Sequence, residues 1–199
     1  MEPIRGIIFD CDGTLADTMP WHYEAWATIL ERYDLAMTED RFYQLGGWPT
    51  TKVAQLLADE SGRAIDVEQL SREKEALFEE MLPQITAIAP VAQTVRQHRG
   101  KLPMAVATGA ILPICERILL QIGLLDQFNT IVSAEDVAHH KPAPDIFLEA
   151  ARRLGVDPLH CQVYEDTDPG IEAAKRAGMR YVDVREFYTP RRVTQSGNI

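Results

Sequence analysis

Two pairs of acidic residues are the part of this sequence best suited to chemistry. Asp10 and Asp12 follow the apolar run of residues 4–9. Glu165 and Asp166 follow another apolar run later in the chain. Residues two apart on an extended segment share a face, so the first pair points the same way. Two carboxylates this close repel each other unless a proton or a cation lies between them. Because Mg²⁺ prefers hard oxygen ligands, the pairs predict a magnesium site.

Simpler interpretations stay open when each pair is taken alone. Residues 10–13 could form an Asp-Gly turn with a capping aspartate. The second pair could belong to a helix N-terminus capped by Asp168. A calcium-binding EF-hand loop is excluded, because it needs glycine and glutamate where this sequence has Leu15 and Trp21. Both pairs together are far more specific than either one.

Two further segments indicate that the ligand is an anion. Thr108 and Gly109 follow an apolar run and open a helical pattern, so they present a hydroxyl and backbone N–H groups at a positive helix end. Lys141 lies in a loop between two apolar runs, with prolines after it. A lone lysine in a loop is usually a solvated surface charge. Its place between the third and fourth predicted strands favours a role in binding a phosphate.

The elements that must position these residues alternate along the chain. Five apolar runs predict buried strands, at residues 4–9, 102–107, 130–133, 161–164 and 180–184. Helical patterns with recognisable ends lie between them, at residues 91–98, 111–122, 144–154 and 169–177. This alternation predicts an α/β fold with a doubly wound parallel sheet and a Rossmann-like core. Ligands bind beyond the carboxyl ends of such strands, where the acidic pairs lie.

A long helical insertion interrupts this rhythm. Its helical patterns cover residues 20–33, 38–44, 49–60 and 67–81, with no convincing strand. We therefore expect an α-helical cap domain at residues 17–82. The catalytic core would consist of residues 1–16 and 83–188, and we expect residues 189–199 to be a loosely held tail.

Composition excludes several classes of partner. The 199 residues include 20 Lys and Arg against 30 Asp and Glu, a net charge of −10, which argues against binding to nucleic acid or anionic membranes. No membrane span or signal peptide is evident, and the three cysteines form no CxxC pair, so we expect a cytoplasmic protein. A cysteine-based phosphatase is excluded, because no arginine lies six residues after Cys11, Cys115 or Cys161.

Four motifs, in order, resemble the haloacid dehalogenase-like hydrolase superfamily. They are Asp10-x-Asp12-Gly13-Thr14, Thr108-Gly109, Lys141-Pro142-x-Pro144-Asp145 and Glu165-Asp166-x-x-x-Gly170-Ile171. Within the superfamily, the chain is similar to the β-phosphoglucomutase-like phosphatases with a helical cap. The motifs span nearly the whole chain. Thr108-Gly109 departs from the commoner Ser-Asn or Ser-Ala form but keeps the hydroxyl.

This resemblance implies an aspartyl-phosphate mechanism with Mg²⁺ as cofactor. It makes Asp10 the nucleophile and Asp12 the general acid and base. It implies a metal site at Asp10, the backbone carbonyl of Asp12 and Asp166, with Glu165 close by. It also implies a phosphate cradle made of Thr108, the Gly109 backbone and Lys141.

The cap is expected to select the substrate. By resemblance, the substrate-binding candidates are His22, Trp26, Gly47, Thr50 and Lys74. His22 and Trp26 lie four apart on one helix face, although a core tryptophan with a surface histidine is the simpler alternative. The mutases have an arginine at the position of Thr50, where it grips a second phosphate. Residues 47–50 look instead like the bacterial fructose-1-phosphate phosphatases of this group.

These features together predict a Mg²⁺-dependent phosphatase of small sugar phosphates, with fructose 1-phosphate favoured. The alternative enzyme is a β-phosphoglucomutase that interconverts β-glucose 1-phosphate and glucose 6-phosphate. A remote alternative is a non-enzymatic phospho-receiver, which also combines clustered aspartates, a hydroxyl and a lysine on a parallel sheet. A receiver has no use for a large cap. We expect the protein to act as a monomer on a small phosphate ester.

Overall fold

The structure, a computed structural model, describes residues 3–193 and divides the chain into two compact units. Of the described residues, the first unit contains residues 3–17 and 85–189, and the second contains residues 18–84 and 190–193. The expected cap at residues 17–82 differs from the helical part of the second unit by one residue at its start and two at its end. Among residues 3–193, no helix has both the length and the apolar character that a membrane crossing requires.

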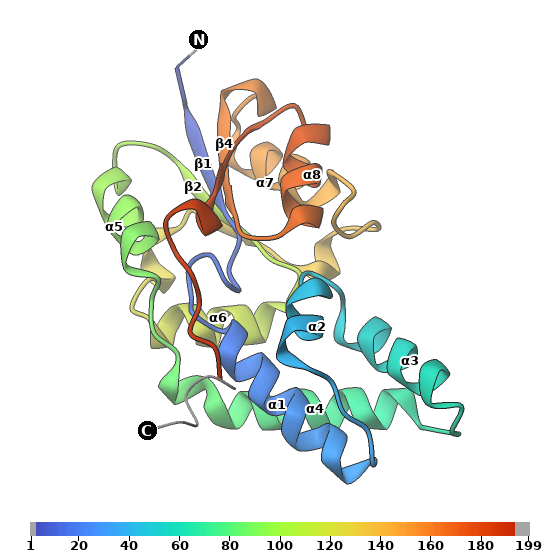
Figure 1. The fold of residues 1–199 in the computed structure, drawn as a ribbon. Helices are drawn as coiled ribbons and strands as arrows, with labels where there is room; N and C mark the ends of the chain where they lie inside the picture. Colours follow the sequence, from blue (N-terminus) through green and yellow to red (C-terminus); the bar gives the residue numbers. More distant parts are fainter. Residues whose placement is uncertain (1–2, 194–199) are drawn as a thin grey trace. The chain divides into compact units, whose positions relative to one another are not determined.

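The first unit is built on a parallel sheet of five strands in the order β3-β2-β1-β4-β5 (Figure 1). The strands are β1 Gly6–Phe9, β2 Met104–Ala107, β3 Thr130–Val132, β4 Cys161–Glu165 and β5 Arg180–Asp183. Phe9 at the end of β1 pairs with Val106 on one side and with Tyr164 on the other. The strand order reverses at β1, and ligand sites of open α/β sheets form at such a point. The predicted fold class is confirmed.

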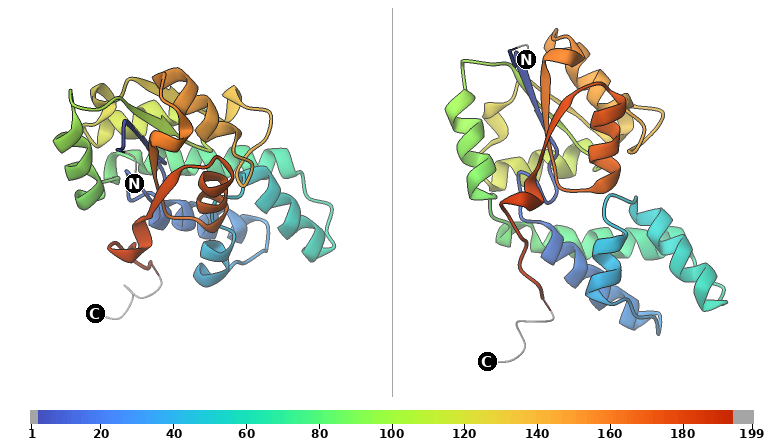
Figure 2. Two further views of the ribbon diagram at one scale, coloured as in Figure 1. Left: turned by 90° about the horizontal axis from the view of Figure 1, so that it is seen from above. Right: turned by 45° about the horizontal axis from the view of Figure 1, so that its top comes forward.

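Helices cover both faces of this sheet. They are α5 Ala89–His98, α6 Leu112–Gln121, α7 Asp145–Leu154 and α8 Asp168–Arg176, with short 3₁₀ turns η2 Leu125–Gln127, η3 Ala134–Asp136, η4 Pro158–His160 and η5 Val184–Glu186. Helices α7 and α8 lie on one side of the sheet and α5 on the other, as the views of Figures 1 and 2 agree. Because β1 is covered on both faces, all four of its residues are buried, which explains its continuous apolar sequence.

Small residues let α7 and α8 approach the sheet closely. Their buried faces contribute Ala150, Ala151, Ala173 and Ala174 to a core that also contains Phe147. Each helix begins with a proline at or beside its first residue, and Gly155 ends α7 in the left-handed region. The prolines and glycines that predicted the ends of these helices from the sequence therefore lie at the helix ends in the structure.

The second unit is helical throughout the part that the structure describes. It contains α1 Met19–Arg32, α2 Glu39–Gln44, α3 Thr50–Ser61, α4 Val67–Met81 and the 3₁₀ turn η1 Leu82–Gln84. Helix α4 packs against both α1 and α3. Thr38 caps α2 and Asp66 caps α4 through side-chain hydrogen bonds to backbone N–H groups. An apolar core that includes Trp26, Phe42 and Leu70 holds the unit together.

Residues 190–193 are held on the second unit, unlike the loose tail expected for residues 189–199. The backbone N–H of Val193 donates a hydrogen bond of 2.8 Å to Oε1 of the buried Glu39. Arg192 lies 3.3 Å from Asp40 and stacks over Tyr43 with its guanidinium 3.9 Å from the ring centroid. The difference arises because Arg192 and the backbone of Val193 have acidic and aromatic partners on α2. The rest of that expected tail, residues 194–199, lies outside the described residues.

Candidate active site

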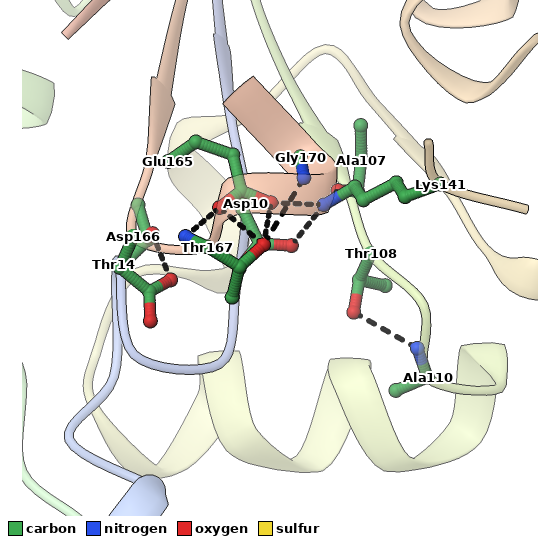
Figure 3. A network of polar contacts seen from close by, with 10 residues as sticks. All are labelled: Asp10, Thr14, Ala107, Thr108, Ala110, Lys141, Glu165, Asp166, Thr167 and Gly170. Atoms are coloured by element: carbon green, nitrogen blue, oxygen red, sulfur yellow. Dashed lines mark hydrogen bonds and ion pairs between the residues drawn. The ribbon is translucent and has the colours of Figure 1, made fainter. Parts of the chain in front are cut away.

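Asp10 and Lys141 form the centre of the acidic site. Asp10 follows β1 directly, and its backbone N–H donates to the carbonyl of Tyr164, which places it at the carboxyl edge of the sheet. Lys141 Nζ lies 2.6 Å from Oδ1 of Asp10, 2.8 Å from Oε1 of Glu165 and 3.4 Å from the carbonyl oxygen of Ala107 (Figure 3). These contacts join residues that are 131 and 24 positions apart in the sequence. Lys141 is therefore not a solvated surface charge.

Gly13 is required by both its backbone and its surroundings. Its φ of +78° lies in the left-handed region, which side chains other than hydrogen disfavour. A Cβ atom at this position would lie 2.2 Å from Oδ2 of Asp166. The neighbouring Thr14 donates from Oγ1 to Oδ1 of Asp166 at 2.9 Å. The Asp-Gly-Thr motif therefore turns the chain after Asp10 and also holds the second aspartate in place.

Glu165, the last residue of β4, is buried and accepts a hydrogen bond from Lys141. Its side chain is 1% exposed. One oxygen accepts a hydrogen bond of 2.6 Å from the backbone N–H of Thr167, whose hydroxyl also lies 3.0 and 3.2 Å from the two carboxylate oxygens. A Cβ atom on Gly170 would lie only 1.7 Å from Oε1 of Glu165, which explains that glycine in helix α8. Glu165 is thus fixed by its own loop and in turn fixes the ammonium of Lys141.

Burial and neighbouring charges shift the pKa values of Asp10, Asp166 and Lys141. Burial is the main cause that raises the pKa of Asp10 to about 7, with Glu165 adding to it and Lys141 opposing it. Burial, with the charges of Glu165 and Asp10, raises the pKa of Asp166 well above its ordinary value. For Lys141, the two carboxylates outweigh burial and raise the pKa above its ordinary value. The site therefore holds more negative charge than its lysine can balance.

A divalent cation fits this surplus of negative charge. Asp10, Glu165 and Asp166 offer carboxylate oxygens that all lie within 4.8 Å of one another. Three carboxylates face one ammonium, and all of the offered ligand atoms are the hard oxygens that Mg²⁺ prefers. Asp12 is not in this group of carboxylates, although its charge is among the causes that raise the pKa of Asp10. The backbone carbonyl of Asp12 stays a predicted metal ligand.

Thr108 and Gly109 lie at the end of β2, the strand next to β1. Thr108 is fully buried, and its Oγ1 accepts a hydrogen bond of 3.0 Å from the backbone N–H of Ala110 (Figure 3). A Cβ atom on Gly109 would meet nothing within 4 Å, so open space lies beside this backbone. Thr108 follows β2, and Lys141 contacts Asp10 after the neighbouring strand β1. Both residues predicted to bind phosphate therefore lie at the same edge of the sheet.

Four of the five predicted cap residues are linked by contacts within the second unit. Nζ of Lys74 lies 2.8 Å from Nδ1 of His22 and 5.8 Å from the ring centroid of Trp26. Thr50 joins them through Glu75, which accepts hydrogen bonds from both Thr50 Oγ1 and Lys74 Nζ. Trp26 is buried in the core of this unit, as the simpler alternative expected of it.

Gly47 is the predicted cap residue that these contacts do not include. It is exposed and has a φ of +81° in the turn after α2. Its conformation explains why a glycine stands there without giving it a part in the cluster.

Comparison with known proteins decides the family. Residues 7–184 match the family described as haloacid dehalogenase-like hydrolase. The chain belongs to this family. The match spans all four of the motifs that carried the resemblance, so that prediction is confirmed.

Individual relatives of this haloacid dehalogenase-like hydrolase are enzymes of phosphate esters. This chain is 42% identical to the fructose-1-phosphate phosphatase YqaB of Escherichia coli over 92% of its own length and 98% of the relative. It is 28% identical to the β-phosphoglucomutase of Bacillus subtilis over 91% of this chain and 83% of that protein. The crystal structure of β-phosphoglucomutase from Clostridium difficile has the same fold, with a TM-score of 0.81 at 23% identity, covering 90% of this chain and 84% of that one.

Sequence reasoning missed two residues that organise these clusters. Thr167 fixes Glu165, and it also caps α8, so the expectation that Asp168 is the cap was wrong: Asp168 is the first residue of the helix. Hydroxyl residues are favoured at N-caps, so Thr167 was a usable signal. Glu75 joins Thr50 to Lys74, but it is one of several glutamates on α4 and nothing in the sequence distinguishes it.

Proposed function

We propose that this member of the haloacid dehalogenase-like family is a Mg²⁺-dependent phosphatase of small sugar phosphates, with fructose 1-phosphate as the favoured substrate. One observation carries the proposal. The buried carboxylate of Asp10 lies at the carboxyl end of the central strand, 2.6 Å from the ammonium of Lys141 and among two other carboxylates. This is the environment that a carboxylate nucleophile for phosphoryl transfer needs. The similarity to the Escherichia coli fructose-1-phosphate phosphatase supports the choice of substrate.

Asp10 and Asp12 perform the two chemical steps in this proposal. In the first step, a carboxylate oxygen of Asp10 bonds to phosphorus and the bond from phosphorus to the sugar oxygen breaks. Asp12 gives its proton to the departing sugar oxygen. In the second step, Asp12 takes a proton from water, the water oxygen bonds to phosphorus, and the bond from phosphorus to Asp10 breaks. Inorganic phosphate leaves, and both aspartates return to their starting states.

The remaining core residues bind and orient the phosphate group. Lys141 supplies a fixed positive charge, and the hydroxyl of Thr108 and the backbone of Gly109 supply hydrogen bonds. Mg²⁺ would be held by the side chains of Asp10 and Asp166 and the backbone carbonyl of Asp12, with Glu165 close by. When bound, it supplies positive charge that offsets the carboxylates and the phosphate.

The cap residues would contact the sugar. His22, Thr50 and Lys74 carry polar groups suited to sugar hydroxyls, Trp26 supports them from the core of the second unit, and Gly47 shapes the preceding turn. We also propose that the enzyme acts in the cytoplasm as a monomer. Its three free and buried cysteines fit a reducing compartment, and gel filtration at several protein concentrations tests the oligomeric state.

A panel of sugar phosphates tests the proposed activity. Release of inorganic phosphate, measured with Mg²⁺ present, should be fastest for fructose 1-phosphate. The alternative enzyme, a β-phosphoglucomutase, is tested with β-glucose 1-phosphate and its bisphosphate activator. Substantial glucose 6-phosphate with little free phosphate would establish the mutase instead. Thr50, which stands where the mutases have an arginine, favours transfer to water.

A further inference from the structure

Glu75 lies at the centre of the polar cluster on α4. Its Oε1 accepts a hydrogen bond of 3.1 Å from Nζ of Lys74 and another from Oγ1 of Thr50. The Lys74 side chain is only 2% exposed, whereas that of Glu75 is 38% exposed. Burial raises the pKa of Glu75, but the charges of Lys74 and His22 and the hydrogen bond from Thr50 outweigh it and lower the pKa below its ordinary value. Glu75 is therefore negatively charged at neutral pH.

Lys74 in turn sets the state of His22. An ammonium group carries only donors, so the 2.8 Å contact makes Nδ1 of His22 an acceptor. The proton of the neutral ring then lies on Nε2. The ring is also held by stacking on Phe78, with 3.7 Å between the ring centroids and 11° between the planes. Lys74 and Glu75 thus fix the orientation and tautomer of the imidazole.

Lys74 and Glu75 form an ion pair within this cluster. The positive charge of Lys74 faces the negative charge of Glu75 at 3.1 Å, and Thr50 contributes a neutral hydroxyl group. A sugar hydroxyl, which both donates and accepts, is well matched to such groups. A second phosphate needs a net positive charge to replace its hydration, and a neutralised lysine does not supply it.

We propose that Glu75 is a specificity-determining residue that favours sugar monophosphates over sugar bisphosphates as substrates. It does so by neutralising Lys74 and by holding Thr50 in place as a hydroxyl partner. The inference rests on the proposed sugar-phosphatase function and names the class of substrate that the cap accepts. Specificity of this kind is a difference between two free energies, and a repulsive charge contributes to it as much as an attractive contact.

The experiment compares the hydrolysis of fructose 1-phosphate and fructose 1,6-bisphosphate at the 1-position. Glu75→Gln keeps the size and the hydrogen-bonding oxygen but removes the charge. We expect the ratio of kcat/KM for the bisphosphate to that for the monophosphate to rise about tenfold, mainly through a lower KM for the bisphosphate. Glu75→Asp, which restores the charge, should bring the ratio back toward that of the wild type. Glu80→Gln makes the same charge change at an exposed position of α4 and should leave the ratio unchanged.

Thr50→Arg provides a second, independent variant, because it adds a positive charge to the same cluster without removing Glu75. It should also raise the ratio, and combining it with Glu75→Gln should raise it further. The inference is overturned if Glu75→Gln does not raise the ratio, whatever Thr50→Arg does, or if Glu80→Gln raises it as much as Glu75→Gln does. A wild-type enzyme active on fructose 1-phosphate with such a result keeps the proposed function. A wild-type enzyme inactive on every sugar phosphate overturns both.

Discussion

The core and the cap each bury a lysine beside carboxylates, yet the two clusters differ in their balance of charge. In the core, Lys141 contacts Asp10 and Glu165, and Asp166 lies within the same group. In the cap, Lys74 forms an ion pair with Glu75. In the core, burial raises the pKa of Asp10 to about 7 and the neighbouring carboxylates add to the rise, whereas the cap lysine helps to lower the pKa of Glu75. The surplus of carboxylates over lysine in the core is the basis of the proposed metal site.

The largest expected effect concerns Asp10, the proposed nucleophile in the unbalanced cluster. Asp10→Asn removes the proposed attacking oxygen while keeping the size of the side chain. Phosphate release from fructose 1-phosphate should fall by at least ~10⁴-fold, because an amide oxygen is a poor nucleophile toward phosphorus. Circular dichroism should show an unchanged fold, since the variant removes a charge that is costly to bury. Hydrolysis at the wild-type rate would mean that Asp10 is not the nucleophile.

Removal of Mg²⁺ tests the surplus directly. With the metal chelated, Lys141 alone should not overcome three carboxylates, so both turnover and binding of the phosphate ester should collapse. Binding of fructose 1-phosphate to the Asp10→Asn variant can be followed by calorimetry before and after chelation, and added Mg²⁺ should restore it. Substrate affinity that survives chelation would contradict this account of the site.

Matched substitutions of the two lysines test the comparison itself. Lys141→Met leaves its buried carboxylates uncompensated, so the metal-free protein should lose ~3 kcal/mol or more of stability. Lys74→Met removes the partner of Glu75, which can be hydrated because its side chain is 38% exposed, and the loss should be ~1 kcal/mol. Denaturation by urea gives both values. Equal losses would show that the balance of charge does not distinguish the two clusters.

The pH dependence of stability gives a smaller effect of definite sign. The pKa of Asp10 rises from 3.8 to about 7 on folding, so between these values the folded protein binds a proton that the unfolded chain releases. The stability of the metal-free protein should therefore fall as the pH rises through this window. Mg²⁺ favours the ionised carboxylates and should reverse the fall near pH 7. Thermal melting with and without Mg²⁺ measures both trends, and a midpoint that rises with pH in the metal-free protein would contradict them.

Most of the core could be predicted from the sequence, because its signals are local. The apolar runs define the strands. Asp10 and Glu165 each come directly after such a run, which is enough to place them at strand ends. What could not be predicted depends on contacts between distant residues. The turn at Gly13 was evident, but its close approach to Asp166 needs the folded sheet.

The cap was predicted less completely for the same physical reason. Its helices are amphipathic and have clear ends, so their bounds were accessible. Glu75 resembles the other glutamates of α4 until Thr50 is placed beside it. The contact of Val193 with Glu39 joins positions 154 residues apart and follows no periodic pattern.

That last contact has a consequence for how the protein is made. The chain passes between the two units three times, and the third passage, after Thr189, brings residues 190–193 onto α2. A ribosome delivers the chain from its N-terminus, so the helices of the second unit emerge long before the segment that meets Glu39 and Asp40. The contacts of residues 190–193 with α2 can therefore form only after all five strands of the first unit have been synthesised.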